Sequence, residues 1–369
     1  MPRELSVSDM GATGDGVTDD TAAVQAAISA AVSIRFPAGT YLLSAPIKVP
    51  SNRRLFGDGN KSVLKKDTRH VGRVIQNDNV TGNHNIVIEH LSIDGGATID
   101  SFRPLEDGIY LTKCQGCSIR FVSVSRCQND GIIIEYGDEN IVENCLVYRN
   151  AKIGIYLSGT SVAHVSRNVC IENNVGGIAV AATKNASILE NVCNQNKLYG
   201  IVCGRDAFNC LVMGNDVIGS LYAFCGVPEP LGGNTLHGIR YDDRERLYGM
   251  RHLRIAHNRF GGKVAMIMAT DTQFEKNTCF NSNSQGLLLQ GSSGNIVRDN
   301  DVEHWNTGFP AGQLASLGTT DGIPLSMQPP LPSDNNKFIG NRFRSSAGAG
   351  ASIVDGGSGN ELRENIFSY

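Results

Sequence analysis

Two aspartates stand one repeat apart in the first half of the chain, each directly before a glycine. Asp107 precedes Gly108 and Asp130 precedes Gly131, a spacing of 23 residues. If the repeats stack, we expect the two carboxyl groups about 5 Å apart, which is the separation of a retaining glycosidase pair. Like charges so close raise one of the two pKa values, and such a pair can perform acid–base catalysis. The alternative is that each aspartate caps its turn by accepting backbone hydrogen bonds.

A second group of candidates lies on the strand expected after each of these glycines. Alternation along residues 132–135 predicts that Ile133 and Glu135 face outward while their neighbours face inward. The same alternation puts Tyr110 and Tyr156 in the column of Ile133, one repeat to either side. A carboxylate flanked by aromatic rings can line a sugar groove, because rings stack on pyranose faces. An ordinary solvated sheet face is the alternative reading.

Basic residues and one polar loop complete the candidate set. A lyase needs a base and a cation that acidifies the proton next to a uronate carboxylate. The stretch 236–244 is the densest polar cluster of the chain and could supply a general base, an arginine and a tyrosine proton donor; a solvated charged loop is the alternative. The catalytic candidates are Asp107, Asp130, Glu135, His237 and Asp242, and the substrate-binding candidates are Tyr110, Lys113, Tyr156, Arg205, Arg240 and Tyr241.

No cofactor or metal site is expected from the motifs. Cys114 and Cys117 form a lone CxxC without a second pair or a histidine at zinc spacing. No glycine-rich phosphate loop is present, since Gly57-Asp58-Gly59 opens no helix. A divalent cation such as Ca²⁺ would suit lyase chemistry, but only the Asp242-Asp243 pair points weakly to one.

A repeat of about 23 residues must position these side chains. The repeats hold short strands rich in Val and Ile, separated by Gly and Asn turns, and show no helical periodicity. We therefore predict an all-β, right-handed parallel β-helix of about ten coils with asparagine ladders at the turns. Asn and Gly suit such turns because both tolerate the left-handed backbone region. The columns are Gly108, Gly131, Gly154, Gly177 and Gly200; Asn150, Asn173 and Asn196; and Asn144, Asn168, Asn191 and Asn215.

Composition narrows the function classes. The chain has 369 residues, and 33 Lys and Arg against 36 Asp and Glu give a net charge of −3. We therefore expect neither a nucleic acid nor a membrane as partner, and no apolar run reaches the about 20 residues of a membrane span. The first residues do not form a signal peptide, and the ten cysteines indicate reduced thiols. A cytoplasmic or phage- or particle-borne location is expected.

The first 60 residues differ from the repeats. Residues 19–28 predict an amphipathic helix that caps the open end of the solenoid. Gly11–Thr21 (GATGDGVTDDT), Phe36–Tyr41 (FPAGTY) and Gly57-Asp58-Gly59 resemble the N-terminal motif of the pectate-lyase-like superfamily. That resemblance implies right-handed parallel β-helices and a carbohydrate ligand. It does not select one reaction, since the superfamily includes lyases, hydrolases, fructan-converting enzymes, epimerases and phage tailspikes.

The resemblance departs from two members of that superfamily at their catalytic motifs. Residues 128–131 resemble a polygalacturonase segment, but the paired aspartates and Gly-His-Gly expected in the following coils are absent. Residues 133–136 stand where alginate C5-epimerases carry Asp-Pro-His-Glu, and only the carboxylate of Glu135 corresponds. Neither chemistry is therefore expected.

We predict one domain over residues 1–369, with the cap and first coils in 1–60 and further coils in 61–369. Insertions near 95–106, 226–250 and 310–334 break the period, and the last two leave the coil at the same point, where they should wall a groove. The leading hypothesis is an enzyme, a hydrolase or lyase, that cleaves or rearranges a poly- or oligosaccharide. The alternatives are a tailspike-like adhesin that binds a glycan without cleaving it, and an intracellular isomerase or epimerase on a small metabolite. Either a homotrimer or a homodimer is compatible with these readings.

Overall fold

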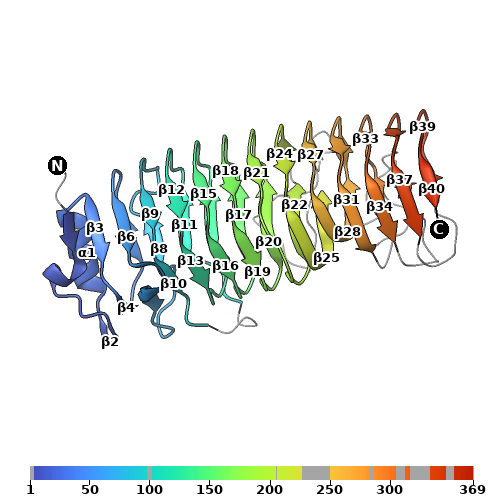
Figure 1. Ribbon diagram of the computed structural model, residues 1–369. Helices are drawn as coiled ribbons and strands as arrows, with labels where there is room; N and C mark the ends of the chain where they lie inside the picture. Colours follow the sequence, from blue (N-terminus) through green and yellow to red (C-terminus); the bar gives the residue numbers. More distant parts are fainter. Residues whose placement is uncertain are drawn as a thin grey trace. The chain divides into compact units, whose positions relative to one another are not determined.

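The computed structural model describes residues 4–97, 102–204, 206–226, 250–282, 286–304, 312–315, 333–345 and 353–368. The chain divides into two compact units, Met1–Ala179 with Leu189–Lys197, and Val180–Ile188 with Leu198–Tyr369. In each unit short parallel strands follow one another coil by coil, as Figure 1 shows. The predicted all-β parallel β-helix is therefore confirmed.

The first unit begins with the predicted helix, α1 (Thr21–Ala30), which starts two residues later than expected. Val24, Ala27 and Ile28 are buried, and the helix packs against the first strands of the unit. The side-chain amide of Gln25 donates to Lys48 O and accepts from Lys48 N, both at 2.9 Å. The helix therefore covers the first coil and satisfies backbone groups of strand β5 that would otherwise face solvent.

The described residues of the first unit form three parallel sheets and two short 3-10 helices, η1 (Val7–Met10) and η2 (Gly59–Lys61). The first sheet holds β1 (Glu4–Ser6), β3 (Ser33–Phe36), β6 (Arg54–Gly57), β9 (Val87–Glu89), β12 (Ser118–Arg120), β15 (Ile141–Glu143) and β18 (His164–Ser166). The second holds β2 (Asp15–Asp19), β4 (Gly39–Leu43), β7 (Ser62–Lys66), β10 (Ser92–Asp94), β13 (Ser123–Ser125), β16 (Leu146–Tyr148) and β19 (Val169–Ile171). The third holds β5 (Ile47–Val49), β8 (Ile75–Asn77), β11 (Ile109–Thr112), β14 (Ile132–Glu135) and β17 (Ile153–Ser158).

The second unit repeats the arrangement in its own described residues. β20 (Gly176–Ala181) and β21 (Ser187–Leu189) span the boundaries of the two units in the sequence. One sheet holds β24 (Leu211–Met213), β27 (Arg254–Ala256), β30 (Gln273–Glu275), β33 (Ile296–Arg298), β36 (Lys337–Ile339) and β39 (Glu361–Arg363). A second holds β22 (Tyr199–Gly204), β25 (Asp216–Gly226), β28 (Arg259–Ile267), β31 (Thr278–Ser282), β34 (Asp301–His304), β37 (Arg342–Ser345) and β40 (Ile366–Ser368), with β32 (Leu287–Gln290), β35 (Gly312–Ala315) and β38 (Ile353–Asp355) branching from β28. A small third sheet holds β23 (Ala207–Phe208), β26 (Met250–Arg251) and β29 (Ala269–Thr270).

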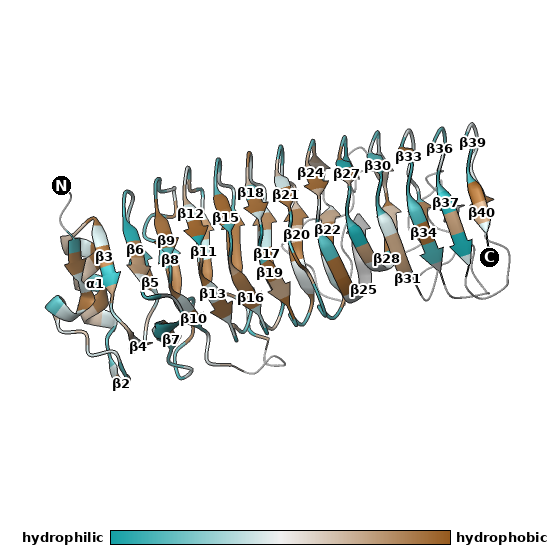
Figure 2. Ribbon diagram, in the orientation of Figure 1, coloured by the Kyte–Doolittle hydropathy of each residue, from teal (hydrophilic) through white to brown (hydrophobic). Residues whose placement is uncertain are grey.

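The core of the first unit is built from the inward-facing residues of successive coils. Figure 2 shows hydrophobic colour along the strands and hydrophilic colour at many turns. The predicted interior positions of Cys170 and Cys193 are confirmed, since both are fully buried. The nine cysteines whose side chains are described are all free and buried. Among the described residues, no helix has the length and the hydropathy that crossing a membrane requires.

The glycine column exists because neighbouring coils approach too closely for a side chain. A Cβ atom on Gly131 would lie 2.5 Å from Val147 Cγ1 and 2.8 Å from Gly154 O. Gly154 meets the same obstacle, with Gly177 O at 2.7 Å. These contacts are shorter than any ordinary carbon contact, so the glycines are required by packing.

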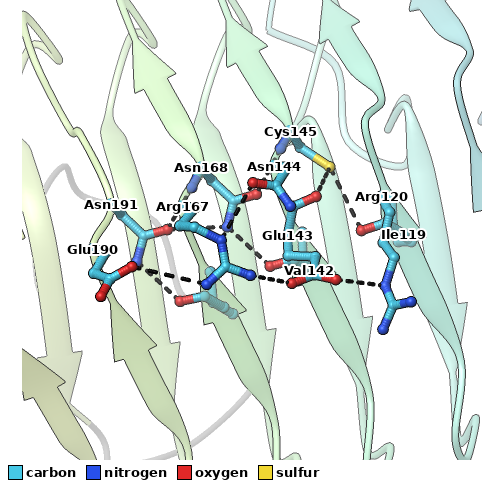
Figure 3. Close-up of polar contacts among 11 residues, drawn as sticks. Ile119, Arg120, Val142, Glu143, Asn144, Cys145, Arg167, Asn168, Glu190 and Asn191 are labelled. Atoms are coloured by element: carbon cyan, nitrogen blue, oxygen red, sulfur yellow. Dashed lines mark hydrogen bonds and ion pairs between the residues drawn. The ribbon is translucent and has the colours of Figure 1, made fainter. Parts of the chain in front are cut away.

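The asparagine ladder is present, but one member was assigned wrongly. Asn168 Nδ2 donates to Val142 O at 2.9 Å and to Asn191 Oδ1 at 3.0 Å (Figure 3). In the coil before, the amide that donates to Asn168 Oδ1 belongs to Cys145, at 3.0 Å. Asn144 therefore stands one position outside the ladder, which explains why its step to Asn168 is 24 residues and not 23.

The left-handed turn position is filled differently from what the sequence predicts. Phe121, Asn144, Arg167 and Glu190 have φ values of 53°, 55°, 54° and 54°, and each directly precedes the ladder position. The buried ladder asparagines are not among the positive-φ residues. Backbone hydrogen bonds to the next coil, such as Arg167 N to Leu189 O at 3.0 Å, hold this turn. They offset a left-handed cost of about 1–2 kcal/mol per residue, so the expectation that asparagine is used for its backbone freedom is wrong.

Candidate functional site

The structure brings Asp107 and Asp130 together at the amino ends of β11 and β14. Asp107 Oδ1 accepts a hydrogen bond from Asp130 N at 3.3 Å, and Asp130 Oδ1 accepts one from Ile153 N at 2.8 Å. Each side chain is 1% exposed. Both carboxylates thus make the backbone-capping contacts that stood as the alternative to catalysis, and they do so while lying side by side.

Two cations flank this pair along the stack. Arg73 Nε donates to Asp107 Oδ2 at 3.0 Å, and Lys152 Nζ lies 3.6 Å from Asp130 Oδ2. Asn129 Nδ2 also donates to Asp107 Oδ1, at 2.6 Å. We call Arg73, Asp107, Asp130 and Lys152 the aspartate-pair cluster. Neither cation was proposed as a partner of the aspartates from the sequence.

The reason differs for the two cations. Arg73 lies 34 residues before Asp107, so the 23-residue repeat carries no signal for it. Lys152 does hold a repeat-related position, because it follows Asp130 by 22 residues and its backbone amide bonds Asn129 O at 3.2 Å. A search for charges beside the aspartate column would have found Lys152 but not Arg73.

Burial changes the acidity of both carboxyl groups. Removal from water raises the pKa of Asp130 to about 7; the Lys152 ammonium opposes this rise and the Asp107 carboxylate adds to it. Burial also raises the pKa of Asp107, against the opposing charge of Arg73. The pair therefore holds a proton at a pH where an exposed aspartate has released it, which is a property required of a general acid.

The predicted aromatic column is in register across three strands. Tyr110 pairs with Ile133, and Ile133 with Tyr156. The Arg73 guanidinium carbon lies 3.6 Å from the ring centroid of Tyr110, and Lys152 Nζ lies 5.7 Å from that of Tyr156. Ile133 is only 4% exposed and Tyr156 only 7%. The column is less open than alternation predicts, because aromatic rings flank Ile133 in register on both neighbouring strands.

Glu135 and Lys113 lie at the other end of these strands. Tyr110 OH donates to Glu135 Oε2 at 2.7 Å, and burial followed by this hydrogen bond raises the pKa of Tyr110 to about 12. Lys113 is exposed, and its backbone N–H donates to Glu135 O at 2.7 Å. The described candidates thus form two groups, the buried aspartate pair and the half-exposed Glu135 with Lys113. Tyr110 connects them, since Arg73 lies on its ring and Glu135 accepts from its hydroxyl.

The remaining candidates lie outside the described residues: Arg205, His237, Arg240, Tyr241 and Asp242. The same holds for most of the insertions near 226–250 and 310–334, so the groove that they were expected to wall stays a prediction. In the part of the chain that is described, no group of three or more His, Cys, Asp or Glu side chains is arranged to hold a metal ion.

The stacked parallel coils define a right-handed parallel β-helix, and residues 233–369 match the family described as right handed beta helix region. The chain belongs to the family described as rhamnogalacturonase A/epimerase, pectate lyase-like, which matches residues 5–202. The resemblance found in the N-terminal motif is thereby confirmed, and the protein is a carbohydrate-related β-helix.

Among its relatives is the preneck appendage protein of Bacillus phage PZA, 34% identical over 180 residues. The match covers 46% of this chain and 20% of that protein, so the chain matches about a fifth of the relative's length. Two solved structures share the fold. The Dettilon tailspike protein has a TM-score of 0.70 at 15% identity, covering 98% of this chain and 66% of that one. The A-module of Azotobacter vinelandii mannuronan C-5 epimerase AlgE6 has a TM-score of 0.66 at 18% identity, covering 99% of both chains.

Proposed function

We propose that this chain is a saccharide-binding β-helix carried on a phage or phage-derived particle. The observation that carries the proposal is its 34% identity to a phage preneck appendage protein, within a family named for carbohydrate enzymes. The tailspike fold likeness agrees with it. A particle-borne binder needs a preformed recognition surface, and the outer face of β11, β14 and β17 offers one.

Three side chains of that face suit recognition of sugar hydroxyl groups. Glu135 provides acceptor oxygens and Lys113 provides ammonium donors, while Tyr110 brings an aromatic body and a hydroxyl. Tyr110 is held on both sides, by Arg73 on its ring and by Glu135 at its hydroxyl. Because its position is set before the ligand arrives, little rotamer entropy is lost on binding.

The test is binding of the full chain to a panel of bacterial cell-surface saccharides, measured by isothermal titration calorimetry. We expect Glu135→Gln to weaken binding about tenfold, the loss of one charge-assisted hydrogen bond. Glu172→Gln is the matched control, since Glu172 is paired with Arg149 at a different turn, and its affinity should equal that of the unchanged chain. Absence of binding to every saccharide would overturn the proposal.

Catalysis by the aspartate-pair cluster is the second candidate function, and one observation favours it. Asp130, with a pKa of about 7, lies beside a second carboxyl group, so a proton donor and a proton acceptor are adjacent. We propose that the pair works as acid and base on a glycosidic bond or on the proton next to a sugar carboxylate. Because both are buried, Arg73 or Lys152 must move aside for substrate to reach them. His237 and Asp242, with Arg205, Arg240 and Tyr241, remain proposed contributors.

Three readouts separate the reactions. A rise in absorbance near 235 nm marks elimination, new reducing ends mark hydrolysis, and deuterium uptake from heavy water marks epimerisation. If the pair is catalytic, Asp130→Asn lowers turnover by about 100-fold or more, and His237→Ala tests the loop in the same assay. Silence in all three readouts while saccharides still bind would leave the chain an adhesin.

A further inference from the structure

An exposed aromatic ring lies directly beside Glu135. Tyr136 follows β14, and its side chain is 63% exposed, whereas that of Tyr156 is 7% exposed. Its backbone has a φ of 53°, and its N–H donates to Ser158 O in the next coil at 2.8 Å. The turn that presents this ring is therefore fixed by a hydrogen bond between coils.

The ring rests on a glycine of the next coil. A Cβ atom built on Gly159 would lie 2.7 Å from Tyr136 Cδ1 and 2.9 Å from Cε1. Only a residue without a side chain leaves this space, so the ring can lie against the backbone instead of standing free in solvent. Its orientation is thereby restricted before any ligand binds, which reduces the entropic cost of stacking.

Polar groups of opposite charge stand next to this ring. Lys113 is exposed at the turn of the coil before, and its N–H bonds Glu135 O at 2.7 Å. Glu135 Oε2 accepts from Tyr110 OH at 2.7 Å, which fixes the carboxylate. One ammonium and one carboxylate together carry no net charge, so the patch does not favour a polyanion.

We propose that Tyr136 is the stacking platform for a neutral hexopyranose ring, with Lys113 and Glu135 hydrogen-bonding its hydroxyl groups. The apolar C–H face of such a sugar lies on the ring, while an ammonium donor and a carboxylate acceptor reach its edge. This inference rests on the proposed saccharide binding and names the ligand class.

Phe121 is a matched control in the same unit. It is 49% exposed and has a φ of 53° at a turn, like Tyr136. However, its ring stacks on His90 with centroids 4.9 Å apart and an interplanar angle of 5°. One face is therefore occupied by a protein ring, and no carboxylate–ammonium pair comparable to Glu135 and Lys113 is assigned there.

The experiment measures binding of the full chain to neutral gluco-, galacto-, manno- and N-acetylhexosamine oligosaccharides by calorimetry. Tyr136→Ala should weaken binding about tenfold or more, Tyr136→Phe should retain it within about twofold, and Phe121→Ala should leave it unchanged. Tyr136→Trp should bind and report the sugar by a blue shift in fluorescence, against the background of the single native tryptophan. This variant keeps the test decisive if Tyr136→Ala does not fold.

The outcomes distinguish the inference from the function on which it rests. Equal binding by the unchanged chain and Tyr136→Ala would overturn the platform, as would binding restricted to anionic saccharides; both results leave saccharide binding itself intact. No binding to any saccharide, neutral or anionic, would overturn both.

Discussion

Asp130 illustrates how one residue can serve the fold and carry chemistry at once. Its carboxyl oxygen caps the next coil at Ile153 N, and its neighbour Asp107 caps Asp130 in turn. Stacking of identical turns is what puts two buried carboxyl groups in contact, and burial is what raises both pKa values. A perturbed acid here follows from repetition of a structural motif, so activity has to be tested separately from acidity.

Stability should depend on pH through Asp130. Its pKa rises from 3.8 in the unfolded chain to about 7 in the folded one, so the folded state binds the extra proton in that interval. The stabilisation is complete below about pH 4 and is lost as pH rises through 7, by up to about 1.4 kcal/mol per pH unit. Urea unfolding of Asp130→Asn across this range should show a flatter pH profile than that of the unchanged chain.

Asp15 supplies a control of opposite sign. Backbone hydrogen bonds from Thr18 and Val17 lower its pKa to about 2, so its stabilisation is present above about pH 4 and is lost as pH falls towards 2. Asp15→Asn should therefore alter the profile only below pH 4. A parallel change in both variants between pH 4 and 7 would contradict the assignment to Asp130.

At the scale of the element, two kinds of ladder connect the coils of the first unit. The buried one joins Asn168 to Asn191 through amide hydrogen bonds. The outward one, drawn in Figure 3, alternates arginine and glutamate: Glu143 lies 2.7 Å from Arg120 Nε and 2.6 Å from Arg167 Nη2. The first is shielded from water and the second is not, so they should differ in magnitude and in salt dependence.

Replacement of Asn168 should be far more costly than replacement of its sequence neighbour in the column. Asn168→Ala leaves Val142 O and Cys145 N without their side-chain partners, which should lower the unfolding free energy by about 2–4 kcal/mol. Asn144→Ala only places alanine at a left-handed turn and should cost about 1 kcal/mol. Urea denaturation measures both, and equal losses would mean that Asn144 is a ladder member after all.

The outward ladder should respond to salt. Glu143→Gln removes the central charge between two partly exposed arginines and should cost about 1 kcal/mol at low ionic strength. That difference should nearly vanish in 1 M sodium chloride, because screening reaches across only about 3 Å there. The loss caused by Asn168→Ala should persist at high salt, and a salt-independent loss for Glu143→Gln would contradict an electrostatic role.

These elements also show how far the sequence could predict the structure. The 23-residue period was sufficient to predict the coils, the glycine column and the register of Tyr110, Ile133 and Tyr156. It could not predict Arg73, because the segment before β8 is not a regular repeat. Nor could alternation predict that Ile133 is buried, since that depends on the size of the neighbouring rings and not on which way the strand faces it.

At the scale of the whole molecule, each unit is a stack in which a coil contacts mainly its neighbours. Stability of such a stack is a sum of coil and nearest-neighbour contributions, so damage should stay local. The two units contain equivalent ladder residues, since Asn300 Nδ2 bonds Asn341 Oδ1 at 2.9 Å as Asn168 bonds Asn191. They can therefore be perturbed in the same way.

Hydrogen exchange measured by mass spectrometry should show this locality. Asn168→Ala should increase exchange in peptides covering β15 and β18, and Asn300→Ala in those covering β30 and β33. Each variant should leave the peptides of the other unit unchanged. Faster exchange throughout the chain in both variants would mean that the two units unfold as one cooperative block.

The left-handed turn position has a consequence for how this surface can diversify. In the first unit it holds phenylalanine, asparagine, arginine and glutamate at successive coils, and in the second unit histidine, lysine and aspartate at 257, 276 and 299. Backbone bonds hold the turn and the next residue secures the ladder, so identity at this position is nearly free of folding constraints. A lineage could rewrite a whole stripe of surface chemistry, coil by coil, to follow a changing receptor while the scaffold stays the same.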